Sequence, residues 1–162
     1  MQFKQADILA GLDKSFIARM MEIGTKSSYE TGKMLFNRGD PARYFFIMIK
    51  GRVKLSVGSN QNSIYTVNHG GEAFGWSALV GGQAYTASAE CIAPSTLIAF
   101  DGDHVEKLMA GDTENAYRLY KNLALTLGTR LTIMNSQLAD NLSAGETISY
   151  GTGQVQEPLE TA

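Results

Sequence analysis

The sequence is short of cysteine, histidine and tryptophan, with 1, 2 and 1 of each among 162 residues. The single cysteine, Cys91, excludes an internal disulfide. It falls in an expected strand with small neighbours, so we predict an inert buried thiol rather than a redox sensor. Metal-ligand spacing, a nucleophile–base pair and paired carboxylates are also missing from the sequence. We therefore expect no enzymatic activity.

Charge of one sign and long apolar runs are also lacking. Lys+Arg number 14 and Asp+Glu 16, for a net charge of -2, and no basic run stands out. The electrostatic footprint of a nucleic-acid binder is absent, and we expect no direct DNA binding. No apolar stretch approaches the roughly 20 residues that span a bilayer. Residues 1–10 lack the charged start and apolar run of a signal peptide. We expect a cytoplasmic protein that does not contact a membrane.

What is present fits one domain with a single core. Hydrophobic residues make up 44% of the chain, and 17 glycines suit a turn-rich β fold. Residues 7–23 have helical spacing, with Asp13 placed to cap a second short helix. Residues 25–101 then read as short strands with frequent turn signals. This alternation predicts a β-sandwich or jelly roll with flanking helices.

Two of these strands have clear patterns. Tyr44–Ile49 is aromatic and β-branched, which predicts a buried strand. Val53, Leu55 and Val57 alternate with polar residues, which predicts a half-buried strand with these three side chains inside. Thr96–Phe100 is expected to be the last strand of the roll.

The period changes again after Asp101, where helices are expected. Asp103 is predicted to cap a short helix, and Asp112 or Thr113 to open a long one ending at about Asn141. The apolar positions of the long helix form a narrow seam with steps of three or four residues, typical of a coiled-coil contact. We predict a parallel homodimer through this seam. The seam residues are Ala116, Leu119, Leu123, Leu127, Leu131, Met134 and Leu138.

The last residues, 143–162, are rich in Gly, Ser, Thr, Gln and Glu and have little apolar content. Such a segment cannot bury enough surface to order itself, so we predict a disordered polar tail. The expected organisation is a domain over residues 1–142, with the roll at about 25–101 and the long helix at about 112–141, followed by the tail.

The stretch from Asn68 to Cys91 is the part of the sequence most informative about function. A polar turn leads into Phe74-Gly75, then into residues able to form one helical turn, a glycine break and a strand of small residues. A glycine followed by a helix start presents free backbone N–H groups, which is the physics of an anion cradle.

Three features together resemble the effector domain of the bacterial CRP/FNR family. The first is Gly39–Ala42 followed by the aromatic strand and the hairpin Gly51–Leu55. The second is Gly71–Gly75, with the sequence G-E-A-F-G, which is similar to the opening of that family's phosphate-binding cassette. The third is a roll followed by a long helix. The resemblance covers about residues 3–141 and implies a double-stranded β-roll with a helical dimer seam. The family's C-terminal helix-turn-helix has no counterpart in this sequence.

Two cassette residues depart from the family pattern. The resemblance places Trp76 where cyclic-nucleotide binders have a glutamate for the ribose, and Tyr85 where they have an arginine for the cyclic phosphate. A hydrogen bond to a charged group contributes roughly 1.5–3 kcal/mol. Losing two such groups would cost about 3–6 kcal/mol, on the order of 10²–10⁴ in affinity. Ordinary cyclic AMP or cyclic GMP binding becomes the weaker hypothesis.

Candidate ligand-binding residues follow from the cassette and from the middle of the long helix, where relatives touch the bound base. Trp76 and Tyr85 could line an aromatic pocket for a flat effector, or could simply fill the space that a nucleotide would occupy. Catalytic residues and metal ligands are not expected. The candidate ligand-binding residues are Phe74, Gly75, Trp76, Ser77, Ala78, Tyr85, Thr86, Ser88, Thr126 and Arg130.

The sequence thus leaves several functions open. The first hypothesis is a regulatory or sensor module that binds a small effector other than a standard cyclic nucleotide and signals through its dimer helix to a partner protein. The second is a ligand-free structural or interaction dimer, and the third is a cyclic-nucleotide-binding transcriptional regulator. Some relatives sense gases through haem, but a single histidine in a polar turn, His69, favours simple solvation, and we expect no cofactor.

Overall fold

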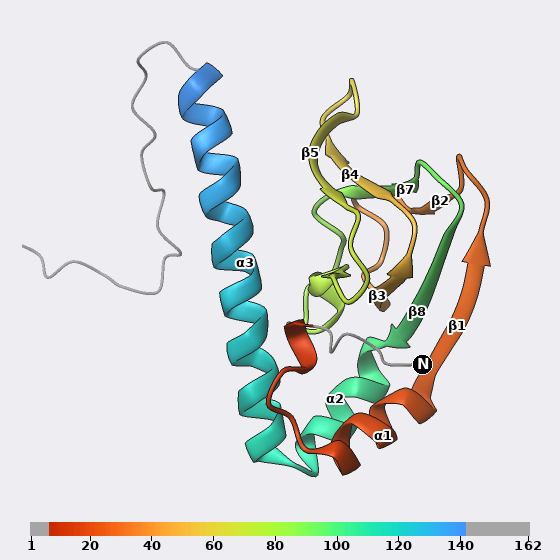
Figure 1. Cartoon of the computed structure of the whole chain (residues 1–162), viewed down its shortest axis with the longest axis vertical. Helices are drawn as coiled ribbons and strands as arrows, with labels where there is room; N and C mark the ends of the chain where they lie inside the picture. Colours follow the sequence, from red (N-terminus) through yellow and green to blue (C-terminus); the bar gives the residue numbers. More distant parts are fainter. Residues whose placement is uncertain (1–6, 142–162) are drawn as a thin grey trace, which may run out of the picture.

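The computed structural model describes residues 7–141, which form two four-stranded antiparallel sheets flanked by helices (Figure 1). The elements in chain order are η1 (Asp7–Leu9), α1 (Lys14–Ile23), β1 (Gly24–Tyr29), β2 (Met34–Phe36), β3 (Tyr44–Lys50), β4 (Val53–Val57), β5 (Asn62–Val67), β6 (Ala73–Phe74), η2 (Trp76–Ala78), β7 (Ser88–Cys91), β8 (Ser95–Asp101), α2 (Gly102–Ala110) and α3 (Thr113–Asn141).

The strand order confirms the predicted β-roll. One sheet runs β1-β8-β3-β6 and the other β2-β7-β4-β5, so β4 and β5 form a hairpin within one sheet, whereas the other consecutive strands alternate between the two layers. β1 and β2 follow each other in sequence but are the edge strands of different sheets. The roll therefore has an open side where these two edges face each other.

β3 and β8, the central strands of the sheet β1-β8-β3-β6, are buried on both faces, which explains why β3 reads as a continuous apolar run. Phe45 and Ile47 point to the helical side and join a core with α1, α2 and α3, whereas Phe46 and Met48 point to the second sheet. The fold thus has two cores separated by one sheet, and the long helix packs only on the outer core.

Helix α2 begins earlier than the sequence suggests. Asp101, the last residue of β8, is its N-cap, and its carboxylate accepts hydrogen bonds from the N–H groups of Asp103 and His104 at 3.1 and 3.4 Å. The prediction that Asp103 caps this helix was wrong, because Asp103 already lies in the first turn. The Arg43 side chain donates to Asp101 at 3.0 Å and lowers the pKa of that carboxyl group.

Asp13 is the N-cap residue of α1, as predicted, but its side chain bonds to α3 rather than to α1. Its side chain makes no capping bond within α1. Its carboxylate instead accepts hydrogen bonds from Asn115 at 3.0 Å and from Arg118 at 3.2 Å, both on α3. The start of α1 is thereby tied to the first turns of α3.

The alternation in β4 breaks in its middle. The register with β5 shifts between Leu55 and Ser56, and Ser56 is buried while Leu55 and Val57 are only half-buried. The pairing passes from Tyr65 to Ser63, so the extra residue of this bulge is Ile64 of β5. Val53 and Leu55 both pack against the core between the sheets, as expected, whereas Val57, beyond the shift, is not part of that core.

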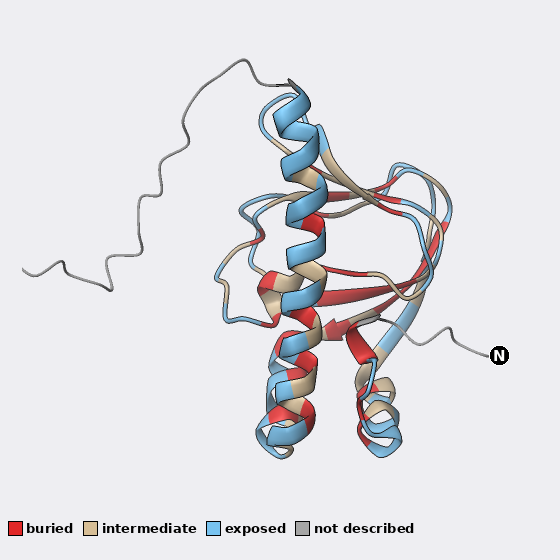
Figure 2. Cartoon of the chain, turned by 60° about the vertical axis from the view of Figure 1, so that its left-hand side comes forward, coloured by how far each residue is buried: buried red, intermediate tan, exposed pale blue. Residues whose placement is uncertain are grey.

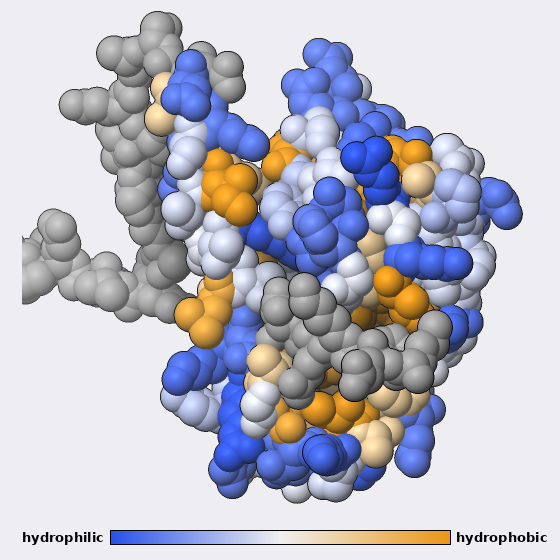
Figure 3. Space-filling model, viewed as in Figure 1, coloured by the Kyte–Doolittle hydropathy of each residue, from blue (hydrophilic) through white to orange (hydrophobic). Residues whose placement is uncertain are grey.

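Helix α3 divides into a packed half and an exposed half (Figure 2). Leu119 and Leu123 are buried in the protein's own outer core, so they cannot belong to a seam with a partner. This corrects the first half of the predicted seam. Further along, Leu131 and Leu138 are 56% and 52% exposed. Figure 3 shows apolar side chains at the surface of this upper part of α3.

Two further expectations can be placed. Cys91 is fully buried in β7, and burial raises the pKa of its thiol, as the sequence interpretation requires. The predicted disordered tail, residues 143–162, lies outside the described residues. Within residues 7–141, no helix is both long and apolar enough to cross a bilayer.

Candidate functional site

Gly75 sets the geometry of the cassette. It is buried with φ of +78°, a left-handed conformation that favours glycine. A Cβ at this position would lie 2.9 Å from the backbone oxygen of Tyr44, so the chain passes too close to β3 for any side chain. The F-G pair of the sequence is therefore explained by close backbone packing where β6 ends and η2 begins.

Tyr85 fills the interior of the cassette. Its ring stacks on Phe36 with centroids 3.7 Å apart, and only 5% of the residue is exposed. Its hydroxyl donates to the Tyr44 carbonyl at 2.7 Å and accepts from the Tyr44 N–H at 2.8 Å. Burial raises the pKa of this phenol, so the hydroxyl stays protonated and keeps both bonds. The side chain is held as firmly as a core residue.

Trp76 borders the same small hollow but does not fill the interior as Tyr85 does. It packs as a half-buried side chain against the outer, helical core, whereas Tyr85 belongs to the core between the sheets. Among the ring contacts of residues 7–141, none joins the two. Of the alternatives from the sequence, the geometry favours filling by Tyr85 over an aromatic pocket shared by both rings.

Little room remains in the cassette. The hollow lined by Gly75, Trp76, Ser77 and Thr86 together with Tyr85 has a volume of about 30 Å³. Such a volume holds little more than a single water molecule. Phe74 is buried against Phe46, with ring centroids 5.1 Å apart.

The remaining cassette candidates are held within the protein itself. The Ala78 N–H donates to the Gly75 carbonyl at 3.2 Å, so one expected cradle donor is already used. The Ser88 hydroxyl accepts from the Arg38 N–H at 2.9 Å.

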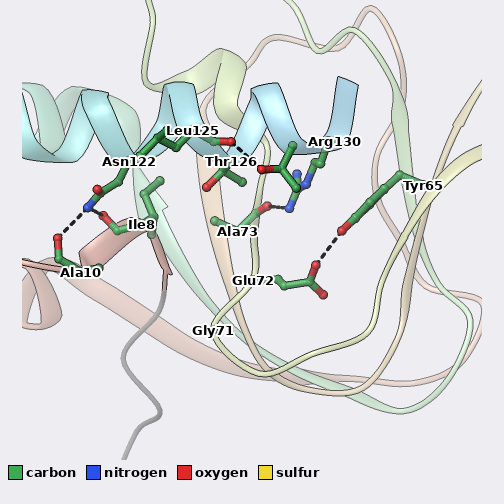
Figure 4. Close-up of a pocket in the computed structure, with 11 residues that line it drawn as sticks. Ile8, Ala10, Tyr65, Gly71, Glu72, Ala73, Asn122, Leu125, Thr126 and Arg130 are labelled. Carbon is green, nitrogen blue, oxygen red and sulfur yellow. Dashed lines mark hydrogen bonds between the residues drawn. The ribbon is translucent and has the colours of Figure 1, made fainter. Parts of the chain in front are cut away.

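A larger cavity lies between the roll and α3, where Thr126 and Arg130 were predicted to contribute (Figure 4). Its volume is about 370 Å³. Binding pockets for small molecules are typically about 300–1,000 Å³. The wall is mixed: polar side chains from α3 face an apolar floor from η1 and from the turn that precedes β6. The lining residues are Ile8, Ala10, Tyr65, Gly71, Glu72, Ala73, Asn122, Leu125, Thr126, Thr129 and Arg130.

Arg130 joins α3 to the roll at this cavity. The residue is only 8% exposed, and its guanidinium donates to the backbone oxygen of Ala73, the first residue of β6. The same guanidinium lies over the Tyr65 ring, 4.6 Å from its centroid. A buried cation that is bonded to one strand and stacked on another fixes the height and rotation of the helix at this point.

Glu72 completes this network from the other side. One carboxylate oxygen accepts from the Tyr65 hydroxyl at 2.8 Å, and the other from the N–H groups of Asn68 and His69 at 3.0 and 2.9 Å. Partial burial alone would raise the pKa of Glu72, but these hydrogen bonds and the charge of Arg130 outweigh it, so the pKa lies below its ordinary value. The glutamate is ionised and holds the turn that opens the cassette.

The candidate residues therefore fall into two groups rather than one site. Those from Phe74 to Ser88 surround a filled cassette, while Thr126 and Arg130 line the cavity on α3. Sequence reasoning missed Tyr65, Asn122 and Thr129. A polar stripe was available as a signal, because Asn122, Thr126 and Thr129 recur at steps of three or four along the helix, and Arg130 lies four residues after Thr126.

The same helix touches the cassette on another flank. The Tyr120 hydroxyl donates to the backbone oxygen of Leu79, just after η2, at 2.9 Å. Arg130 and Tyr120 thus hold α3 to the two ends of the segment from Ala73 to Leu79. Loss of either hydrogen bond would therefore weaken the attachment of α3 to this segment.

A metal or haem site has little support in the described residues. Among residues 7–141 no group of three or more His, Cys, Asp or Glu side chains could hold a metal ion. The side chain of His69 is 79% exposed, with Nδ1 3.5 Å from Glu72. The expectation of no cofactor stays a prediction.

A comparison with protein families identifies the roll. The family model described as the cyclic nucleotide-binding domain matches residues 26–112, from β1 to the residue before α3. The chain belongs to the cyclic nucleotide-binding domain family. Among curated relatives, the CRP-like cAMP-activated global transcriptional regulator of Mycobacterium tuberculosis is 25% identical over 138 residues, 84% of this chain. The resemblance to the CRP/FNR effector domain is confirmed.

Another curated relative is an enzyme. Glutaminase 1 of Bradyrhizobium diazoefficiens is 27% identical over 139 residues, 85% of this chain. The chain spans 60% of the length of the Mycobacterium regulator but only 22% of the glutaminase. The match to the glutaminase thus concerns a minor part of that protein.

Solved structures agree on the fold. A cyclic nucleotide-binding domain from Methylobacillus flagellatus superposes with a TM-score of 0.75 at 16% identity, covering 88% of this chain and 84% of that one. The catabolite activator protein of Thermus thermophilus superposes with a TM-score of 0.66 at 20% identity, covering 82% and 62%. The cyclic nucleotide-binding domain fold is thus present from η1 through most of α3.

Proposed function

We propose that this cyclic nucleotide-binding domain is a regulatory module that responds to a small effector other than cyclic AMP or cyclic GMP. The effector binds between the roll and α3, and the signal passes through a dimer of α3 to a protein partner. One observation carries the proposal: Tyr85 occupies the cassette interior and is bonded there at both the N–H and the carbonyl of Tyr44. A standard cyclic nucleotide would have to displace it.

The cavity on α3 supports the location of the effector. It is more than ten times larger than the hollow left in the cassette, at about 370 against about 30 Å³. Its polar groups include the Arg130 guanidinium and the Thr126 hydroxyl, both on the helix. A ligand that offers an acceptor to Arg130 would compete with the Ala73 carbonyl for it. Binding would then loosen or shift α3 relative to the roll.

The exposed face of α3 supports the dimer. Beside the fully buried Leu119 and Leu123, α3 carries an apolar row with alternating steps of three and four residues, the heptad pattern of a coiled coil, and its member Leu127 also packs partly on the outer core. The row contains Leu127, Leu131 and Met134 and extends at both ends. The full row is Tyr117, Tyr120, Ala124, Leu127, Leu131, Met134 and Leu138. This row replaces the seam expected from the sequence, from which it differs in its first three members.

Sedimentation equilibrium tests the dimer. Leu131→Asp would place two facing carboxylates in an apolar seam, and we expect the dimer dissociation constant to rise by about 100-fold or more. Leu125→Asp is the matched control, because Leu125 is equally exposed, at 63%, but lies on the flank that lines the cavity. Equal dissociation of both variants, or a monomeric wild type, would remove the seam from the proposal.

Calorimetry and thermal shift test the effector. Cyclic AMP and cyclic GMP are titrated first, followed by a panel of anions, nucleotides and flat metabolites. Thr129→Leu blocks the cavity, whereas Thr132→Leu changes a threonine one turn further on whose hydroxyl makes the same kind of bond to the helix backbone. We expect a panel member to stabilise the wild type and Thr132→Leu but not Thr129→Leu. Low-micromolar binding of either standard cyclic nucleotide would overturn the proposal.

A ligand-free interaction dimer is the second candidate, and the filled cassette favours it too. The two functions differ in one measurement: stabilisation by no member of the panel, with an intact dimer, is the outcome of the second. A cyclic-nucleotide-binding transcriptional regulator is the third. It gains support only if cyclic AMP binds tightly despite Tyr85. In each case the module itself is proposed to have no enzymatic activity.

A further inference from the structure

A second cavity of comparable size lies on the open side of the roll and plays no part in the proposed function. It has a volume of about 380 Å³ and is bounded by β1 and β2, the edge strands of the two sheets. In Figure 1 these strands follow each other at the side of the roll away from α3. The α3 cavity and this cavity have no lining residue in common.

Small side chains on the inner face of the first sheet create the hollow. Thr25 on β1 is paired with Ala99 on β8, and Ala99 is paired with Phe46 on β3. Thr25 and Ala99 are much smaller than the neighbouring Phe46, so they leave space above the sheet at its β1 edge. The second sheet reaches over it only with β2, which is three residues long. Ser27 lies two residues after Thr25 on the same face of β1, and its small side chain extends this space along the strand.

Aromatic rings form the walls above this floor. Tyr29 closes one end of this space, while Tyr44 and Phe46 stand on β3. The Tyr44 and Phe46 ring centroids are 6.5 Å apart at a 56° angle, so the two rings meet as a corner. A flat ring system entering between the edges would stack on one of these rings and meet the edge of the other.

One cation stands at the rim. Lys33, at the start of the segment leading into β2, lines the cavity, and none of the ion pairs found in residues 7–141 involves it. Arg43 lies against the Tyr44 ring, with its guanidinium carbon 5.2 Å from the centroid, but it is paired with Asp101, which leaves Lys33 as the cation available to a ligand. No carboxylate lines the cavity. The Thr25 and Ser27 hydroxyls supply further polar contacts on the floor.

We propose that the cavity between the edge strands β1 and β2 is a ligand site for a small planar aromatic acid. Its ring system stacks on Tyr44 and meets the edge of Phe46, its acid group pairs with Lys33, and the floor hydroxyls bond to a polar substituent. The volume lies within the range of small-molecule pockets. Because Phe46 also touches the ring cluster that includes Phe36, the site adjoins the packing that holds Tyr85.

The probe is 2-naphthoate, with 2-naphthamide as its uncharged counterpart, titrated by calorimetry and by amide chemical shifts on the whole chain. We expect saturable binding at one site, with shift changes gathered on residues 25–29 and 33–35. The amide should bind about tenfold more weakly than the acid, because it forms no charge-assisted bond.

Paired variants locate the site. Lys33→Gln should weaken 2-naphthoate about tenfold, whereas Lys26→Gln, a lysine of β1 outside the lining, should change it by less than about twofold. Thr25→Leu fills the floor and should weaken binding at least about tenfold, and Ser27→Leu serves the same purpose if the first variant fails to fold. Thr129→Leu, in the α3 cavity, should have no effect.

Three outcomes would overturn the proposal. They are the absence of saturable binding, equal weakening by Lys33→Gln and Lys26→Gln, and loss of binding in Thr129→Leu with retention in Thr25→Leu. The last would assign aromatic acids to the α3 cavity instead. The first two outcomes do not bear on whether the regulatory module has an effector at α3, which the panel and the Thr129→Leu and Thr132→Leu pair decide separately.

Discussion

The cassette and the α3 cavity contrast in what they contain. In the cassette the backbone frame of the family is kept, down to the left-handed Gly75, but the protein's own Tyr85 occupies the interior. At α3 the side chains leave about 370 Å³ open beside a buried cation. The frame of a binding fold and the room for a ligand are therefore separate properties, and only side chains decide the second.

Converting the cassette back is expected to give the largest effect. The double variant Trp76→Glu with Tyr85→Arg supplies a carboxylate and a guanidinium where the family pattern has them, and it also removes the ring that fills the interior. Two hydrogen bonds to charged groups predict a gain of about 10²–10⁴ in affinity for cyclic AMP. Calorimetric titration of both proteins measures it.

The single variants are the controls for that gain. Trp76→Glu alone leaves Tyr85 in place, so its affinity should stay near that of the wild type. A double variant that folds but binds no better than Trp76→Glu would show that more than these two side chains separates this chain from the nucleotide binders of its family.

Emptying the cassette should be the next largest effect. Tyr85→Ala removes a buried ring that stacks on Phe36 and leaves a cavity, which we expect to lower the free energy of unfolding by about 3–5 kcal/mol. Urea denaturation measures it, with Val80→Ala as the control, because Val80 is 48% exposed and should change stability by less than about 0.5 kcal/mol. A loss below about 1 kcal/mol for Tyr85→Ala would mean that the ring is not structural.

These contrasts mark what the sequence could and could not predict. The roll, the long helix and its start at Asp112–Thr113 were predicted, because alternation, turn residues and helical spacing are local signals. The cap at Asp101 and the bulge at Ile64 of β5 were missed, because each depends on where a neighbouring strand ends or shifts. The two halves of α3 could not be separated, since Leu119 and Leu131 are the same residue type and differ only in what packs on them.

The site shows the same division. That Trp76 and Tyr85 replace polar residues was visible in the sequence, but which of them fills the interior was not. Both line one small hollow, but Trp76 packs against the outer core and Tyr85 against the core between the sheets, and their separation of nine residues in the chain gives no hint of that. The role of Arg130 depends on the Ala73 carbonyl and the Tyr65 ring, which no spacing connects to it.

Releasing Arg130 should test whether the open cavity is rigid. Arg130→Met keeps the apolar volume but leaves the Ala73 carbonyl without its donor and removes the cation from Tyr65. We expect a loss of about 2–3 kcal/mol of unfolding free energy. Amide exchange should also become faster in residues 131–140, beyond the lost contact. Lys121→Met, an exposed lysine of α3, is the control. An equal and small effect of both variants would mean that α3 is held by its apolar contacts alone.

The smallest effect concerns the carboxylate that the cavity shares with the turn opening the cassette. Glu72→Gln weakens the bonds from Tyr65, Asn68 and His69, and should lower the free energy of unfolding by about 1–2 kcal/mol at neutral pH. The folded-state pKa of Glu72 is depressed, so its contribution is complete above the ordinary value of 4.5 and is lost as the pH falls through the folded-state pKa. The gap between wild type and Glu72→Gln should therefore close on acidification.

Urea denaturation at a series of pH values below neutrality follows this gap. Glu22→Gln, on the exposed side of α1, serves as the control and should differ from the wild type by less than about 0.5 kcal/mol throughout. If the gap for Glu72→Gln keeps its size at the lowest pH where the chain still folds, the glutamate acts through its shape rather than its charge. The turn would then hold itself together, and only Arg130 would connect the cassette to the cavity on α3.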